Sequence, residues 1–356
     1  MEHEIHLQVI RAGARHAHRP NTAAARIILG LMVALALVLA FTRLVNLASV
    51  FERLDHLSIA PAALCGVAFL SAYSVRALRW RRLLGGRGIT RRRVIAVYQV
   101  AIFVNWLLPL RGGELVKSVL LRRLNAIPIS ESLPTVAMDK SMDLMPAIGL
   151  LLLLPFVPFH LSRPLWVLLI TVLAFLVAVA LFLGLAAVRR HIALALLACL
   201  TARLPVPLRR RVEPFSTQFV DALLALIVQP RLLLVATAYT AVAVCLDAAF
   251  CFLAFQAVGE RVALPVILYG YTFYNLAYML PTPPGQIGSN ELIGLVVFSG
   301  LFQLNRSAVA AMFLFSHPWT ALLMAGSGLV SLGVIGVGVR PMLALARQPA
   351  EGNSAR

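Results

Sequence analysis

Long apolar runs, separated by short clusters of basic residues, constrain what this chain can fold into more than any other feature. Residues Ile27 to Phe41, Leu165 to Val188 and Leu232 to Leu246 form runs that are almost wholly apolar. Such runs approach or reach the roughly 20 residues that cross a hydrocarbon core as a helix. Because 60% of the chain is hydrophobic and only 13% is charged, one soluble core could not bury its apolar side chains. The sequence therefore predicts an all-α, polytopic transmembrane helical bundle.

The positive charge of the chain lies between these apolar runs. The net charge is +18, but the basic residues form no single continuous domain, so we expect no nucleic-acid partner. Cytoplasmic loops collect Lys and Arg, and anionic lipids attract them by about 1 kcal/mol per side chain. The loop after the second apolar run is arginine-rich, whereas those near Glu52 to Asp55 and Glu260 to Arg261 are balanced in charge. We therefore expect a bacterial inner (cytoplasmic) membrane protein with both termini in the cytoplasm. The arginines assigned to the basic loop are Arg76, Arg79, Arg81, Arg82, Arg87, Arg91, Arg92 and Arg93.

Two apolar segments, 94–124 and 264–302, are interrupted in the middle by proline and glycine. Irregular backbone at membrane depth is tolerated only where protein or a wet cavity covers it, so we interpret both segments as re-entrant hairpins. The remaining runs predict six full crossings, so the transmembrane domain covers 27–339 between cytoplasmic tails at 1–26 and 340–356. The expected crossings are at about 27–41, 59–78, 133–159, 165–188, 232–258 and 308–339.

The two interrupted segments resemble each other. Leu-Pro-Leu-Arg-Gly-Gly-Glu-Leu-Val at 108–116 can be laid beside Leu-Pro at 280–281 followed, after a short insertion, by Gly-Ser-Asn-Glu-Leu-Ile at 288–293. An asparagine near aromatic residues precedes each break, Asn105 in one and Asn275 in the other. The predicted topology inserts the two hairpins from opposite faces, which is an inverted repeat and indicates a transporter site near mid-membrane. Chance similarity is the alternative, since Leu, Pro and Gly are common in this chain.

Each break carries a glutamate where a helix would restart, Glu114 and Glu291. A carboxylate there can be a simple cap, because free amide groups and the helix dipole favour it. An ionisable group at this depth costs at least about 2.5 kcal/mol and is usually functional, so we expect both to bind a cation, a proton or an amine-bearing headgroup. Arg111 and Lys117 suit a lipid phosphate. The alternative is that these two side chains snorkel to the interface and anchor the hairpin.

The third predicted crossing carries charges in its first half. Asp139 and Asp143 are four residues apart and share one helical face, with Lys140 beside them. Two carboxylates on an apolar helix need cations, and Lys140, Arg111 and Lys117 are the available ones. We therefore expect a buried charge network between this helix and the first hairpin, with a structural role, a substrate-binding role or both.

Asp247 and His317 stand apart from these motifs in the sequence. We interpret His317, beside the kinking Pro318, as a hydrogen-bonded packing residue, because no second His or Cys lies at metal-ligand spacing. The chain shows no convincing Ser–His–Asp set, no Gly-x-Ser-x-Gly and no glycine-rich phosphate loop. We therefore predict neither an enzyme nor a metal, a cofactor or an ATP motor.

Three stretches in order, 105–117, 135–143 and 280–291, resemble the transmembrane region of lysylphosphatidylglycerol synthases, part of a wider family of flippase-like membrane proteins. The resemblance covers nearly all of the chain between the first and last predicted crossings. It implies translocation of a lipid between leaflets, of aminoacylated phosphatidylglycerol in the best-known members, while others are linked to isoprenoid-lipid, hopanoid or glycolipid pathways. The family commonly has Arg at the Lys117 position, an acidic-Arg pair at Asp139-Lys140 and Gly at the Gln286 position, and these departures bear on the headgroup more than on the fold.

We therefore expect a flippase-like transporter of a polar-headgroup lipid, without the soluble aminoacyl-transferase domain because only a short tail follows the last crossing. The alternatives are a non-transporting scaffold of a lipid-modifying or glycosyltransferase enzyme, which would then be a partner, and a membrane-embedded lipid transferase. A homodimer is left open. The expected substrate-binding residues are Asn105, Arg111, Glu114, Lys117, Asp139, Lys140, Asp143, Asn275, Gly285, Gly288 and Glu291.

Overall fold

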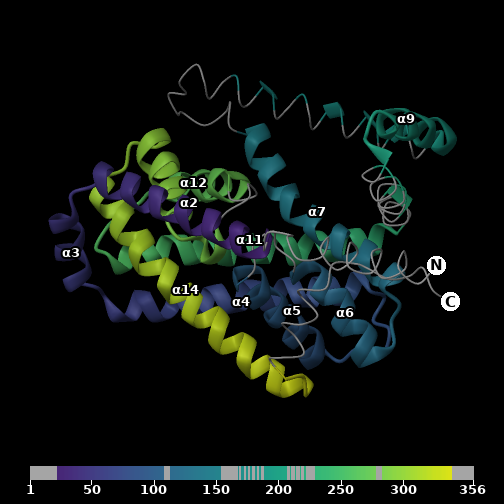
Figure 1. The fold of residues 1–356 in the computed structure, drawn as a ribbon, viewed down its shortest axis with the longest axis horizontal. Coiled ribbons are helices and arrows are strands. Elements are labelled where there is room, and N and C mark those ends of the chain that lie inside the picture. Colours follow the sequence, from purple (N-terminus) through teal and green to yellow (C-terminus); the bar gives the residue numbers. More distant parts are fainter. Residues whose placement is uncertain are drawn as a thin grey trace, which may run out of the picture.

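The computed structural model describes residues 22–107, 113–153, 188–206, 229–277 and 283–338, with scattered positions between 167 and 221. Every regular element within these ranges is a helix, which confirms the all-α prediction (Figure 1). The predicted tails, 1–26 and 340–356, lie almost entirely outside the described residues. The helices are α2 (Thr22–Leu44), α3 (Leu47–Asp55), α4 (Ile59–Leu83), α5 (Arg91–Leu107), α6 (Gly113–Asn125), α7 (Ile129–Leu153), α9 (Arg190–Ala202), α11 (Pro230–Ala257), α12 (Leu264–Ala277), η3 (Pro284–Gln286), α13 (Ser289–Gly294), the π-helix η4 (Leu295–Leu301) and α14 (Arg306–Ile335).

Among the described residues, three helices are long and apolar enough to cross a membrane, namely α4, α11 and α14. A fourth crossing is formed if α2 and α3 count as one span, although the two are bent by 88°. Asn46 makes this bend by capping α3, since its side chain accepts a hydrogen bond from the Ala48 amide at 3.1 Å. The predicted crossing at 165–188 lies largely outside the described residues, and the count of six stays a prediction.

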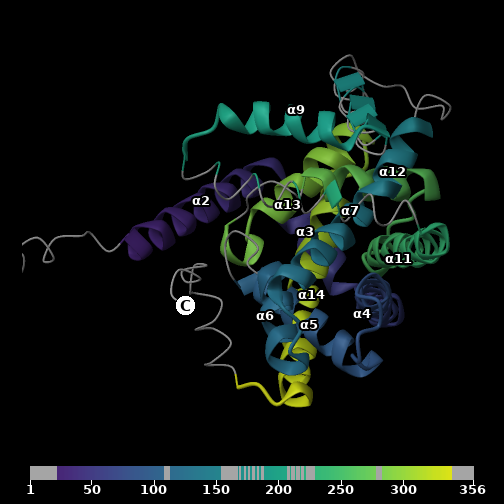
Figure 2. The ribbon, with the colours of Figure 1, turned by 90° about the vertical axis from the view of Figure 1, so that its right-hand side faces the viewer.

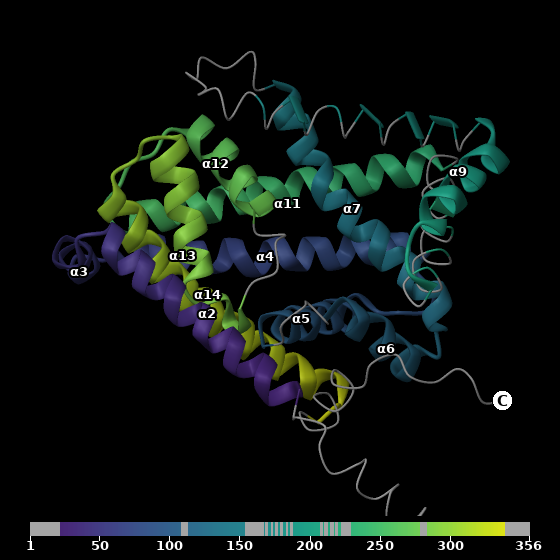
Figure 3. The same ribbon diagram turned by 45° about the horizontal axis from the view of Figure 1, so that its top comes forward.

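Helices α4 and α11 pack side by side along their length and run antiparallel (Figure 3). In Figure 2 the pair is seen end-on at one side of the bundle. The Ser58 amide, just before α4, donates a hydrogen bond to the carbonyl of Ala257, the last residue of α11, at 2.9 Å. Helix α14 packs against α5, α3 and this pair. Asn305 caps the start of α14 by accepting from the Ser307 amide at 2.9 Å, and Gly336 ends it in the left-handed conformation.

Two helical hairpins flank the α4–α11 pair. The first consists of α5 and α6, and it begins after the end of α4 and leads into α7. The second consists of α12 followed by α13 and η4, and it begins after the end of α11 and leads into α14. Because α4 and α11 are antiparallel, the outer ends of the two hairpins lie at opposite ends of the pair (Figure 3). The first break, at 108–112, lies outside the described residues.

Each hairpin has its own apolar core. Around the second hairpin, the rings of Phe255 and Phe298 meet edge-on with centroids 5.2 Å apart, and Phe313 of α14 packs against them. Around the first hairpin, Trp80 and Tyr98 are fully buried and pack with centroids 6.2 Å apart. Polar groups enclosed by such close-packed side chains interact more strongly than they would in water.

Candidate functional site

The first break is closed by a side chain of α5. Asn105 accepts a hydrogen bond from the Gly113 amide at 2.7 Å and donates to Glu114 Oε1 at 3.3 Å. Position 113 requires glycine, because a Cβ there would lie 2.0 Å from the carbonyl oxygen of Ala101. Glu114 occupies the first turn of α6, as the sequence predicted. Arg111, the other predicted residue of this break, lies outside the described residues.

Two lysines share the carboxylate of Glu114. Lys117 Nζ lies 2.8 Å from Oε2, and Lys140 Nζ lies 3.3 Å from Oε1. The two cations differ in access, since the side chain of Lys117 is 1% exposed and that of Lys140 is 50% exposed. Lys117 also lies over the ring of Tyr98, 3.7 Å from its centroid, where a desolvated ammonium gains a cation–π interaction. Glu114 therefore joins a buried cation to an accessible one.

Two arginines of α4 meet the carboxylates of α7 from the other side. Arg79 donates from Nε to Asp139 Oδ1 and from Nη2 to Asp143 Oδ1, both at 2.8 Å. Arg76 donates from Nε to Asp143 at 3.2 Å, and its guanidinium also pairs with Asp247 of α11. The network thus ties α4, α7 and α11 together.

The prediction that Arg76 and Arg79 belong to a cytoplasmic loop is wrong. Helix α4 continues to Leu83, and the side chain of Arg79 has no exposed surface. The hydropathy pattern placed the end of this crossing near residue 78, before the true end of the helix. The arginines beyond that point pair with carboxylates on other helices, and a local sequence pattern cannot show such pairing. Their spacing of three residues, which keeps both on one helical face, is the signal that could have identified them. Asp247, which seemed isolated in the sequence, is the partner of Arg76.

The described part of this network is balanced in formal charge, with four cations facing four anions. The links to the first hairpin are Lys117, 3.7 Å from Asp139, and Lys140, so the expected network between α7 and this hairpin is present. Tyr98 donates to Asp139 at 3.0 Å, and Arg79 donates to Thr240 of α11 at 2.9 Å. Balanced charge and the hydrogen bonds of Arg79 and Asp139 lower the cost of burying these ions, whereas Lys117 Nζ and Glu114 Oε2 meet as an ion pair without a hydrogen bond. The network residues are Arg76, Arg79, Lys117, Lys140, Glu114, Asp139, Asp143 and Asp247.

The second break is shaped by glycine. Gly285 and Gly288 have φ values of 65° and 78°, the left-handed region that favours glycine. A Cβ on Gly288 would lie 2.7 Å from Cβ of Leu37, so glycine also permits α2 to approach the break. Helix η3 of this break packs against α5 of the first hairpin, which brings the two interrupted segments near each other.

Glu291 lies in the first turn of α13, as predicted, and meets His317 of α14. Nδ1 of the imidazole is 2.5 Å from Glu291 Oε1, and Nε2 is 2.9 Å from the carbonyl oxygen of Gly285. Both side chains are 9% exposed. His317 is hydrogen-bonded, as expected, but it does not stand apart from the motifs. Asn275 is exposed on α12.

The family model for the lysylphosphatidylglycerol synthase TM region matches residues 27–328. The chain belongs to this family. The match covers the charge network, both breaks and the Glu291–His317 pair, so these features lie in the part of the chain that defines its membership. Comparisons with curated proteins and with solved structures gave no match. Membership and the apolar helices together make the chain a multi-pass, lipid-related membrane protein.

Position 286, at which the resemblance implied glycine, has a backbone that favours glycine. Gln286 adopts a φ of 61° and is 9% exposed. A left-handed conformation costs a residue with a Cβ roughly 1–2 kcal/mol, which glycine avoids.

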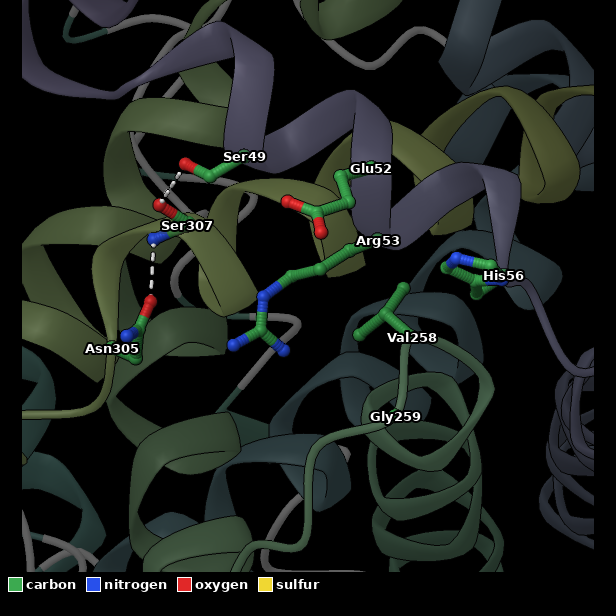
Figure 4. Close-up of a pocket in the computed structure, with 8 residues that line it drawn as sticks. All are labelled: Ser49, Glu52, Arg53, His56, Val258, Gly259, Asn305 and Ser307. Atoms are coloured by element: carbon green, nitrogen blue, oxygen red, sulfur yellow. Dashed lines mark hydrogen bonds between the residues drawn. The ribbon is translucent and has the colours of Figure 1, made fainter.

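This family member also has a cavity away from both breaks. It encloses about 540 Å³ at the end of the bundle where α3 meets the start of α14 (Figure 4). Arg53 reaches into it and donates to Glu260 at 3.1 Å, and the hydroxyls of Ser49 and Ser307 are 2.9 Å apart. The two charge-balanced segments therefore lie together at one end of the bundle, although the first is not the predicted loop, because Glu52 to Asp55 belong to α3. The lining residues are Ser49, Glu52, Arg53, His56, Val258, Gly259, Asn305 and Ser307.

Proposed function

We propose that the protein moves a polar-headgroup lipid between membrane leaflets and returns it chemically unchanged. The observation that carries this proposal is the Glu114–Lys140 pair, the accessible edge of an otherwise buried, charge-balanced network. A headgroup phosphate can replace Glu114 beside Lys140, and a headgroup amine can replace Lys140 beside Glu114. In either exchange each charge keeps a partner, so the headgroup enters the bundle without the full penalty of an unpaired ion in hydrocarbon.

The proposed path lies between the two hairpins. We infer that they form an inverted repeat, inserted from opposite faces of a bacterial inner membrane, with six full crossings and cytoplasmic termini. The opposite placement of the hairpin ends along α4 and α11 supports this topology. The acyl chains would remain in lipid while the headgroup passes through the polar interior, which lowers the free-energy cost of crossing. Phospholipids, aminoacyl-phospholipids, isoprenoid lipids and glycolipids are the candidate substrates.

The test is leaflet transfer by the purified protein in vesicles that carry one labelled lipid at a time: phosphatidylglycerol, lysylphosphatidylglycerol, phosphatidylethanolamine or a polyprenyl phosphate. Glu114→Gln keeps the shape of the side chain but removes its charge, leaving Lys117 and Lys140 without their shared carboxylate. We expect at least about a tenfold loss of transfer, which corresponds to roughly 1.4 kcal/mol in the barrier.

Asp221→Asn is the matched control. It removes a carboxylate from an exposed ion pair, in which Asp221 lies 2.9 Å from Arg190, away from the network. We expect unchanged transfer. Equal rates in wild type and Glu114→Gln would remove the site assignment. No transfer of any of these lipids by the wild type would favour a scaffold, and recovery of a modified lipid would favour a transferase.

A further inference from the structure

The hydrogen bonds of His317 indicate how many protons the His317–Glu291 pair holds. Nε2 lies 2.9 Å from the carbonyl oxygen of Gly285, which can only accept, so Nε2 carries a hydrogen. Nδ1 lies 2.5 Å from Glu291 Oε1. A contact this short requires a hydrogen between the two atoms, because two lone pairs would repel each other. Either a neutral imidazole accepts from a protonated Glu291, or an imidazolium donates to the carboxylate. In both cases the pair holds one shared proton.

Two of the helices beside this pair supply no permanently charged side chain, since neither α12 nor η4 contains an Asp, Glu, Lys or Arg residue. The tyrosines of the packed helices are Tyr269, Tyr271 and Tyr274 of α12 and Tyr98 of α5. Tyr274 donates to Asn290, and Tyr98 donates to Asp139. Glu291 Oε2 is buried and has no hydrogen-bond partner. The charged residues of the other helices packed here are Arg26 and Arg43 of α2, Arg91, Arg92 and Arg93 of α5, and Arg306 of α14.

The two breaks therefore differ in what neutralises their glutamate. Glu114 faces two ammonium groups, those of Lys117 and Lys140. Glu291 faces an imidazole, which can be neutral or cationic depending on whether it carries one proton or two. If the shared proton leaves, the carboxylate of Glu291 stays in an apolar site beside a neutral imidazole. Proton loss must then be accompanied by a rearrangement that brings water or a cation to Glu291.

The backbone around the pair is suited to such a rearrangement. Gly285 and Gly288 hold left-handed conformations on one side of Glu291, and Pro318 interrupts the hydrogen bonding of α14 next to His317. A change in backbone dihedral angles at these glycines would separate His317 Nδ1 from Glu291 Oε1 without unfolding α13 or α14.

We propose that Glu291 and His317 form a proton-binding site, loaded with one proton in this structure, and that its unloading accompanies movement of the lipid headgroup. On unloading, the Nδ1···Oε1 hydrogen bond breaks and the proton passes to water, leaving neutral His317 and the Glu291 carboxylate. The coupling rests on the proposed lipid transfer, whereas the proton site does not. The protein would then use a proton gradient to bias transfer toward one leaflet.

The proton site is tested first, without transport. A difference titration compares the purified wild type with the double variant Glu291→Gln/His317→Gln, in which neither side chain titrates. We expect the wild type to hold one proton at neutral pH that the double variant lacks, and to release it as the pH rises. Identical titration curves in the neutral range would overturn the proton site.

The coupling is tested with vesicles under an imposed pH gradient. His317→Gln suits this test, because its amide can still donate to the Gly285 carbonyl but cannot titrate. One proton per lipid and one pH unit support a leaflet ratio of up to about tenfold in the wild type. We expect this ratio to fall to the gradient-free value in His317→Gln.

His56→Gln is the matched control, since His56 is exposed at the cavity of α3, and it should keep the wild-type ratio. A ratio in His317→Gln equal to that of the wild type would overturn the coupling, as would a wild type that transfers lipid but ignores the gradient. A wild type that transfers no lipid would overturn the proposed function and the coupling together, and the titration would still decide the proton site.

Discussion

The two breaks of this protein place a glutamate at the start of a helix inside an apolar bundle, but they neutralise it differently. Among the described residues, Glu114 belongs to a network of eight charges on four helices, whereas Glu291 pairs with His317. In the first break, lysine and arginine side chains match the carboxylates. In the second, glycines in the left-handed conformation shape the backbone, and a histidine faces the glutamate. Similar sequence motifs can therefore place a glutamate in two different electrostatic surroundings.

The largest expected effect tests whether charge holds the first break together. Arg79→Met removes the guanidinium that faces Asp139 and Asp143 and leaves both carboxylates buried with fewer partners. We expect the free energy of unfolding to fall by about 3–5 kcal/mol, measured by denaturant unfolding in micelles. Arg190→Met, in the exposed pair with Asp221, should change it by less than about 1 kcal/mol. Similar losses in both variants would contradict a special role for the buried network.

A smaller effect tests whether backbone conformation shapes the second break. Gly288→Ala places a Cβ at a φ of 78° and within 2.7 Å of Leu37, so we expect a loss of about 2–3 kcal/mol in the same assay. Gly333→Ala is the control, because a Cβ there meets no atom within 4 Å inside α14. Alanine favours a helix interior, so this control should be neutral or stabilising. A stable Gly288→Ala protein would show that the break tolerates other shapes.

The smallest effect has the opposite sign. Gln286→Gly relieves the left-handed conformation of Gln286, so we expect a gain of up to about 1 kcal/mol in unfolding free energy. Gln256→Gly, at the penultimate residue of α11, relieves no left-handed conformation and should instead lose up to about 1 kcal/mol. If Gln286→Gly also destabilises the protein, contacts of the glutamine side chain outweigh its backbone strain, and the second break is less dependent on glycine than proposed.

Part of the site could be predicted because its residues are close in sequence. The four-residue spacing of Asp139 and Asp143 places both on one face of α7, and the glycines before Glu114 and Glu291 place each glutamate in a first helical turn. These relations follow from helix geometry, which depends only on neighbouring residues. The existence of a charge network could therefore be inferred before any tertiary contact was known.

The partners that complete the site could not be predicted in the same way. Arg79 lies 60 residues from Asp139, Arg76 lies 171 residues from Asp247, and Glu291 lies 26 residues from His317. A hydropathy profile depends only on residues close in sequence, so it contains no information about a carboxylate on another helix. It therefore assigns an arginine to a loop even where that arginine is paired inside the bundle. The end of α4 was misplaced for this reason.

The sequence by itself determined the membrane class, the helical fold, the two breaks and the family. The physical reason is local, since an apolar run can satisfy its backbone hydrogen bonds only within its own helix when lipid surrounds it. Only the tertiary structure decided which charges meet, which glutamate faces lysine and which faces histidine. Those pairings depend on distances across helix contacts of a few ångströms, where electrostatic energy changes steeply and sequence spacing carries no information.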